Sequence, residues 1–458
     1  MIIRKILVNK IRVVMEPMKN YASIAIGVWV DAGSVNENPA NNGVAHVVEH
    51  MLFKGTKSRS ARDIADEMTA IGGNLDAYTS KECTCYYTRT LGEYAGKALE
   101  IMADMLINSK IDPDDLKKEL GVILDEIDMY EDDADEQVHE LLQKEVWGDH
   151  PLGYIISGEK EIVRNFTCDD VRSFMDTYYN GGHMVISVAG NFDEDALLEN
   201  IKKYFGDIPA GPGAGRSEPI SDCRELMSGG HGLLAAASDR SCTPAIYRQS
   251  ILCRHKDIEQ MHLDLAFDCI SYDHEDKYVM AVVNSILGGN LNSRLFQEVR
   301  EEKGLTYTIY SYGSSFKNCG LFQIYAAMAP EQTHRVLDAV FEAIHRMAVE
   351  PVTERELTLT KQQIRTELLM ATESTHNRME ANAKAWIYQK TQESIQQTIA
   401  RVEALTARDI KCFMDKYLTL SKASLSLIGN FTSLDPARIN CVLDKWKNPL
   451  RLSEETES

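Results

Sequence analysis

Residues 43–56 have the sequence Gly43-Val44-Ala45-His46-Val47-Val48-Glu49-His50-Met51-Leu52-Phe53-Lys54-Gly55-Thr56. If this stretch forms a helix that ends at Gly55, His46 and His50 lie one turn apart on one face, with Glu49 between them. Two neutral imidazoles at this spacing can bind one zinc ion, and the glutamate can take a proton from a water that the zinc binds. The order His-x-x-Glu-His inverts the commoner His-Glu-x-x-His motif. The stretch therefore predicts a metal-binding helix around which the rest of the chain is organised.

The composition excludes several classes of protein. The chain has 458 residues, of which 44% are hydrophobic, so it can bury large cores and form more than one domain. With 49 Lys and Arg against 69 Asp and Glu, its net charge of −20 argues against nucleic acid or an anionic membrane as a partner. The same charge leaves room for basic peptides. The ten cysteines follow no extracellular disulfide pattern, and no run reaches 18 apolar residues, so we expect a cytoplasmic protein that is neither secreted nor membrane-spanning.

Strands and helices alternate around the metal-binding stretch. Residues 2–15 and 21–32 have strand character and are separated by a turn at residues 16–20, so we expect them to form a hairpin. A helix is expected at residues 61–71, strands within 75–91, and helices at 93–109 and 112–147. Hairpin-linked strands interspersed with helices indicate an α+β fold, in which a mainly antiparallel sheet is covered by helices.

A zinc ion held by two histidines needs a third protein ligand, and the helix expected at residues 112–147 is rich in acids. Within it, Glu119 and Glu126 are seven residues apart and fall close to one face. Helical spacing alone does not decide between these two carboxylates.

The second half of the chain repeats the first. Residues 166–192 and 405–431 align without a gap at an offset of 239, and ten of the 27 positions are identical. In each copy the pattern predicts a helix followed by a strand, which indicates a duplication. We therefore expect two homologous domains, residues 1–208 and 258–448, joined by a linker and irregular insertion at 209–257 and followed by a tail at 449–458.

The second domain contains no His-x-x-Glu-His sequence. In its place, residues 288–307 predict a loop, a helix and the start of a strand, and they include Arg300 and Tyr307. One half of the chain is therefore expected to carry the chemistry, while the other has a different role.

With the inverted zinc motif, the repeated halves and the segment from Arg300 to Tyr307, the chain resembles the pitrilysin/insulinase superfamily. It is most similar to the short branch that contains the mitochondrial processing peptidase and its bacterial homologues. The resemblance runs through nearly the whole chain, except residues 223–257 and the last ten or so. In that family the third zinc ligand is a Glu 76 residues after the second His, which falls on Glu126. An acidic residue seven positions earlier, here Glu119, supports the site.

The same resemblance implies roles for several further residues. Glu49 becomes the general base, and the substrate binds as an added strand on a sheet edge near residues 75–80, which include Asp76, Ala77 and Tyr78. Asp76 stands where the family more often has Asn. Arg300 and Tyr307 match an Arg and a Tyr, seven residues apart, that hold the substrate backbone and the developing oxyanion.

We therefore expect a zinc-dependent endopeptidase with one zinc ion per chain, acting on peptides or unfolded polypeptide segments. A dedicated leader-peptide or presequence processing protease and a non-catalytic peptide-binding subunit of a heterodimer are the alternatives. Because related heterodimers divide the zinc residues and the Arg/Tyr pair between subunits and this chain has both, a homodimer is expected. Each of its sites would combine one chain's zinc residues with the other chain's Arg300 and Tyr307.

Overall fold

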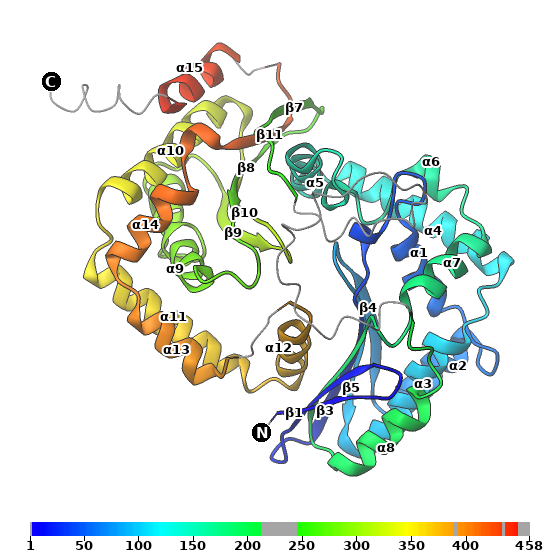
Figure 1. Ribbon diagram of the computed structural model, residues 1–458. Coiled ribbons are helices and arrows are strands. Elements are labelled where there is room, and N and C mark those ends of the chain that lie inside the picture. Colours follow the sequence, from blue (N-terminus) through cyan, green and yellow to red (C-terminus); the bar gives the residue numbers. More distant parts are fainter. Residues whose placement is uncertain (1, 212–244, 389–392, 433–435, 448–458) are drawn as a thin grey trace, which may run out of the picture. The chain divides into compact units, whose positions relative to one another are not determined.

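The computed structural model describes residues 2–211, 245–388, 393–432 and 436–447, and its elements are shown in Figure 1. The tail predicted at 449–458 and most of the predicted insertion lie outside the described residues. The chain forms two compact units. The first contains Met1–Asp128, Tyr154–Thr243 and Ala371–Gln392, and the second contains Met129–Gly153, Pro244–Met370 and Glu393–Ser458. These units differ from the contiguous domains predicted from the sequence, because each unit takes a segment from the other half of the chain.

The first unit is built on a six-stranded sheet with the order β1-β2-β6-β3-β5-β4. Its strands are β1 (Ile3–Ile6), β2 (Arg12–Pro17), β3 (Ser23–Val30), β4 (Asn74–Thr79), β5 (Thr84–Leu91) and β6 (Met184–Gly190). Its main helices are α1 (Val44–Leu52), α2 (Ala61–Ala70), α3 (Ala95–Asn108), most of α4 (Pro113–Asp132), α6 (Lys160–Val163), α7 (Cys168–Tyr178), α8 (Glu194–Phe205) and α12 (Thr375–Tyr388). Short 3-10 turns lie at Ser34–Asn36 and Gly92–Tyr94.

Both faces of this sheet are covered. Alternate residues of β3 face opposite sides, so Ile24 and Ile26 join the core under α1, α3 and α7, while Ala25 and Trp29 join a second core. The second core contains Met379 of α12, and Figure 1 shows α12 on the face of the sheet opposite α3 and α8. Burial on both faces explains why β3 and β6 are almost continuously apolar rather than alternating.

Helix α12 is fastened to the sheet by polar contacts as well as by packing. The Arg378 guanidinium donates to both carboxylate oxygens of Glu16 on β2, with distances of 2.6 Å from Nη2 and 3.0 Å from Nε. Asn382 Nδ2 donates to the same carboxylate at 2.7 Å. Ser187 Oγ on β6 donates to the Met379 carbonyl at 2.7 Å. A helix from the second half of the sequence is thus an integral part of the first unit.

The second unit repeats this plan. Its sheet has the order β7-β11-β8-β10-β9, with strands β7 (Ile251–His255), β8 (Met261–Cys269), β9 (Thr308–Ser315), β10 (Gly320–Met328) and β11 (Ser424–Gly429). Its helices are α5 (Ala134–Trp147), α9 (Lys277–Leu287), the π-helix η7 (Phe296–Glu302), α10 (Thr333–Val349), α11 (Glu354–Ala371), α13 (Ile395–Ala404), α14 (Ala407–Tyr417) and α15 (Pro436–Lys447). Short 3-10 turns lie at Pro151–Gly153, Pro330–Gln332 and Leu420–Lys422.

Helix α5 belongs to the first half of the sequence but packs on this second sheet, against β11 and β8. Its His139 bonds through Nδ1 to Oδ2 of Asp264 at 2.8 Å, and Gln323 Nε2 donates to the same buried oxygen at 2.7 Å. Since α12 covers the first sheet and α5 covers the second, the two repeats exchange one helix each.

The duplicated segments have matching structures. Helices α7 and α14 both begin with a Thr N-cap paired with an Asp three residues later, at Thr167 and Thr406. The strands that follow, β6 and β11, both end at a glycine with positive φ, +138° at Gly190 and +155° at Gly429. The predicted α+β fold class is confirmed, and the two sheets share a five-strand order to which the first sheet adds β1 at one edge.

Two local predictions are wrong. Residues 2–15 and 21–32 do not pair as a hairpin, because β6 lies between β2 and β3 and pairs with both. The Met18 main-chain nitrogen donates to the Gly190 carbonyl, so the connection crosses the end of β6. The helix predicted at 112–147 is broken at Asp133, which caps α5 by accepting from the Asp135 main-chain nitrogen. Among the described residues, no helix combines the length and apolar character needed to cross a lipid bilayer.

Candidate metal centre

Helix α1 begins at a glycine and is capped by a buried carboxylate. Gly43 has a φ of +100°, a conformation that favours glycine. Glu37 accepts hydrogen bonds at 2.8 Å from the main-chain nitrogens of Gly43 and Ala45 and from Asn42 Nδ2. Because the first N–H groups of a helix lack partners within it, the two oxygens of Glu37 fix the start of the helix that carries His46. Burial raises the pKa of Glu37 to about 8, and the hydrogen bonds oppose that rise.

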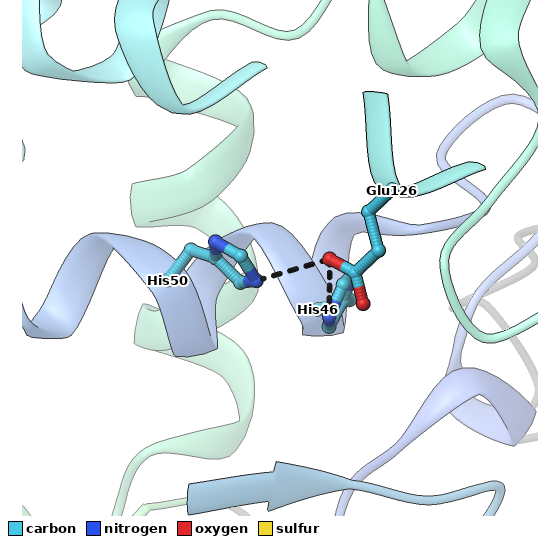
Figure 2. Close-up of side chains that lie close together, drawn as sticks. All are labelled: His46, His50 and Glu126. Atoms are coloured by element: carbon cyan, nitrogen blue, oxygen red, sulfur yellow. Dashed lines mark ion pairs between the residues drawn. The ribbon is translucent and has the colours of Figure 1, made fainter. Parts of the chain in front are cut away.

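Three ligand atoms meet between α1 and α4 (Figure 2). His46 Nε2 lies 3.9 Å from Glu126 Oε2, and His50 Nε2 lies 3.6 Å from the same oxygen. One ligand atom from each of the three residues lies within 4.8 Å of the other two. Burial, with a smaller contribution from His50, lowers the pKa of His46 to about 4. The His46 imidazole is therefore neutral at pH 7, as a metal ligand must be.

These residues fit a zinc ion. Ligand atoms about 2.1 Å from a tetrahedral zinc are separated from one another by about 3.4 Å, so the two distances to Glu126 need to shorten only slightly. Two imidazole nitrogens and one carboxylate oxygen form a set typical of catalytic zinc, with a fourth position left open. In the part of the chain that the structure describes, no other group of three such side chains comes this close together.

Glu119 occupies a supporting position beside the three ligand atoms. It lies two turns before Glu126 on α4, and its Oε2 is 3.2 Å from Nδ1 of His50, the ring nitrogen that faces away from Glu126. Its other oxygen is 2.6 Å from Lys54 Nζ. A carboxylate on the second nitrogen of a metal-binding histidine fixes the ring orientation and its tautomer. The distances thus distinguish Glu126, which faces both imidazoles, from Glu119, which contacts only one of them, that of His50.

Glu49 projects from α1 beside the three ligand atoms and is not one of them. Thr79 Oγ1 on β4 donates to Glu49 Oε2 at 2.5 Å. Burial raises the pKa of Glu49, whereas the Thr79 hydrogen bond and His50 lower it and the charge of Glu126 raises it further. A carboxyl group whose pKa is raised above its ordinary value is better suited to act as a general base.

The residues expected to bind substrate lie on β4, the last strand of its sheet. In the described residues, β5 is the strand that pairs with β4, and no strand pairs with its other edge. Because side chains alternate along a strand, Asp76 and Tyr78 face away from α1, while Ala77 faces the core below it. Asp76 accepts a hydrogen bond from Asn74 Nδ2 at 2.6 Å, and the Tyr78 hydroxyl accepts one from Trp29 Nε1 at 3.3 Å.

Arg300 and Tyr307 lie together in the second unit. Arg300 is on the π-helix η7, and its guanidinium carbon lies 4.9 Å from the centre of the Tyr307 ring and 4.5 Å from the centre of the Phe296 ring. Tyr307 is 77% exposed, while Arg300, whose side chain is 30% exposed, lies over the face of the Tyr307 ring.

Three residues of this centre, Thr79, Lys54 and Glu37, were not predicted from the sequence. Thr79 and Lys54 carry spacing signals that could have been used, since Thr79 is two positions after Ala77 on a strand and Lys54 is four positions after His50 along the same stretch. No local pattern points to Glu37, because its role depends on how the loop before α1 folds back on the start of the helix.

Comparison with known families divides the chain in the same way as the motifs do. The model described as insulinase (peptidase family M16) matches residues 12–160, which contain the histidines and Glu126. The model described as the peptidase M16 inactive domain matches residues 165–364.

Individual relatives match over almost their whole length. An uncharacterized zinc protease, YmxG, of Bacillus subtilis is 36% identical over 93% of this chain and 98% of its own. An uncharacterized zinc protease of Streptomyces coelicolor is 34% identical over 95% of this chain and 91% of its own. The crystal structure of a peptidase M16 inactive domain from Pseudomonas fluorescens superposes with a TM-score of 0.84 at 20% identity, covering 95% of this chain and all of that one.

Proposed function

We propose, since the chain belongs to the insulinase family (peptidase family M16), that it is a zinc-dependent endopeptidase that cleaves peptides or unfolded polypeptide segments. The observation that carries the proposal is the separation of roles at α1. His46, His50 and Glu126 offer a ligand set for one zinc ion per chain, while Glu49 stays outside that set with one carboxylate oxygen hydrogen-bonded to Thr79 and the other available for proton transfer.

The chain's own residues would perform the steps as follows. Zinc, when bound, supplies a Lewis acid that polarises a carbonyl and lowers the pKa of water. Glu49 takes the proton of the attacking water and passes it to the leaving amine. Glu119 holds the His50 ring in place by a hydrogen bond to Nδ1 of that ring, and Lys54 balances the charge of Glu119.

We further propose that substrate adds as a strand to the unpaired edge of β4 beside Asp76, Ala77 and Tyr78. Main-chain hydrogen bonds of this kind tolerate many sequences, so a broad peptide specificity is expected. Arg300 and Tyr307 would bind the substrate backbone and the developing oxyanion. A dedicated leader-peptide or presequence processor would use the same chemistry, and profiling the cleavage of an unbiased peptide library distinguishes it from a general peptidase.

A cytoplasmic location belongs to the same proposal and rests on the ten cysteines scattered without a disulfide framework. A non-catalytic peptide-binding subunit would have no use for an intact ligand set and base, so the presence of all four residues supports an enzyme.

Substitutions at the site separate metal binding from base catalysis. Glu49→Gln should keep zinc but lose turnover by roughly 10²- to 10⁴-fold, because the general base is gone. Glu126→Gln should lose zinc itself, whereas Asp125→Asn, an exposed neighbour on α4, is the matched control and should keep both zinc and activity. Zinc content and peptide cleavage are measured on each protein. A fully active Glu49→Gln protein would refute the mechanism.

We also propose a homodimer in which each site combines the zinc residues of one chain with Arg300 and Tyr307 of the other. Glu49→Gln and the double variant Arg300→Ala/Tyr307→Phe should each be nearly inactive alone. In an equal mixture whose subunits exchange, half of the dimers are mixed and each has one intact site, so activity should recover to about a quarter of wild type. If differently tagged chains exchange and no activity returns, the Arg/Tyr pair does not act across subunits.

A further inference from the structure

The side chain of Thr79 reaches from the edge strand β4 to the proposed general base. Along β4, Leu75, Ala77 and Thr79 share the face toward α1, and Thr79 is the last residue of the strand. Its Oγ1 lies 2.5 Å from Glu49 Oε2. The strand whose free edge is proposed to bind substrate is therefore the strand that contacts the base.

The backbone on both sides of this contact is held in place. Directly after Thr79, the Ser80 main-chain nitrogen and Oγ both donate to the Cys83 carbonyl at 2.8 Å, which closes the turn between β4 and β5. The loop before α1 bonds to the same turn, since the Val35 nitrogen donates to the Lys81 carbonyl at 2.8 Å. A Cβ at Gly33 would lie 2.2 Å from the Ser80 carbonyl oxygen, so a glycine is needed for this approach. The end of β4 and the start of the metal-binding helix are thus fixed relative to each other.

Other groups near Glu49 do not take the place of Thr79. Tyr86 and Tyr179 are buried close by, but their hydroxyls bond to each other at 2.8 Å. Within the described ranges, Thr79 makes the only hydrogen bond found to the Glu49 carboxylate. His50 and Glu126 act on Glu49 through their charges rather than by a hydrogen bond.

We propose that Thr79 is a positioning residue for Glu49, holding one carboxylate oxygen so that the other is directed at the attacking water. This inference rests on the proposed peptidase function. It assigns to β4 two tasks at once, because its main chain would bind the substrate while its terminal side chain orients the base. Losing a hydrogen bond to a charged group typically costs a factor of roughly 10 to 100.

The test compares Thr79→Val, which keeps the shape and removes the hydroxyl, with Thr79→Ser, which keeps the hydroxyl. Thr79→Val should lower kcat roughly 10- to 100-fold with KM within about twofold of wild type, and Thr79→Ser should restore kcat to within about threefold. Zinc affinity, measured by competition with a chelating dye, should be unchanged in both. Thr90→Val is the matched control, because it removes a hydroxyl that donates to the Ile71 carbonyl, away from Glu49. It should leave kcat unchanged.

A second readout does not depend on turnover. Crystal structures of the metal-free proteins should show Glu49 in one rotamer in wild type and Thr79→Ser, and displaced or spread over several rotamers in Thr79→Val. An unmoved, single Glu49 rotamer in Thr79→Val, or a kcat within twofold of wild type, would overturn the proposal. So would a loss of zinc that accounts for the loss of activity. If wild type cleaves no peptide, the proposed function fails, while the rotamer comparison still decides whether Thr79 positions Glu49.

Discussion

Breaking the Arg378 to Glu16 ion pair should release α12 from the first sheet. The pair is mostly withdrawn from water, with side-chain exposures of 15% and 16%, and the guanidinium contacts both carboxylate oxygens. Removing one partner of such a pair leaves an uncompensated buried charge at a cost of about 3 to 5 kcal/mol. Because Asn382 continues to donate to Glu16, we expect Arg378→Met to fall at the lower end, about 3 kcal/mol.

Hydrogen exchange measured by mass spectrometry can follow this loss locally. A change of about 3 kcal/mol in the opening of α12 should speed exchange of its main-chain amides roughly 100-fold, while the amides of β10 in the second unit change little. Arg365→Met on α11 is the matched control, because its ion pair with Glu403 is long, 4.0 Å, and half exposed. Such a pair contributes at most about 1 kcal/mol.

A double variant shows whether the lost protection of α12 comes from the unpaired charge of Glu16. In Arg378→Met/Glu16→Leu neither charge remains, so most of the lost protection of α12 should return. Unchanged exchange in Arg378→Met would refute the idea that this pair anchors the helix. If the double variant is as unprotected as the single one, the arginine stabilises α12 through the packing of its stem rather than through its charge.

Three further predictions concern the metal centre and its substrates. Burial raises the pKa of Glu37 from 4.5 to about 8, so its contribution to stability is full below pH 4.5 and is lost as the pH rises to about 8. The difference in unfolding free energy between wild type and Glu37→Gln, followed by thermal unfolding, should therefore fall by up to about 5 kcal/mol across that range. A difference that does not change with pH would contradict this prediction. Removing zinc with a chelator should lower the unfolding midpoint of wild type, while Glu126→Gln should show little change on the same treatment. The net charge of −20 should make basic peptides cleaved faster than matched acidic ones at low salt, with the ratio falling as salt is added; equal rates at low salt would exclude such steering.

The candidate metal-binding helix α1 and the repeated segments could be predicted from the sequence because their signals are local. The spacing of His46 and His50 requires only a helix, which α1 provides, and the Thr and Asp caps of α7 and α14 are three residues apart. Strand character was likewise indicated at residues 21–32 and within 75–91, where β3, β5 and most of β4 lie. A local sequence pattern does not show which residues far along the chain will pack against it.

Most differences from the sequence-based prediction have that origin, whereas the helix break at Asp133 comes from a local cap that accepts from the Asp135 main-chain nitrogen. The expected hairpin fails because β6, more than 150 residues later in the chain, inserts between β2 and β3. The roles of Glu37 and Thr79 depend on a loop and a strand that tertiary structure brings to α1. Helical spacing left Glu119 and Glu126 equivalent. The family resemblance assigned them different roles, and the distances agree, because Glu126 lies near both imidazoles whereas Glu119 lies near Nδ1 of His50.

The exchange of α5 and α12 has a consequence for the origin of the chain. In a half-length ancestor with one repeat, the helix equivalent to α5 and α12 would not have packed on its own sheet. The face that now carries Ala25 and Trp29 would then have been exposed to water. Two identical copies could cover each other's sheets by exchanging that helix, and such an assembly is a domain-swapped dimer. Gene duplication and fusion would then have made the helix exchange intramolecular, so that one copy could lose the candidate metal-binding residues while the other kept them. In this view neither half is an autonomous folding module, and each completes the other's core.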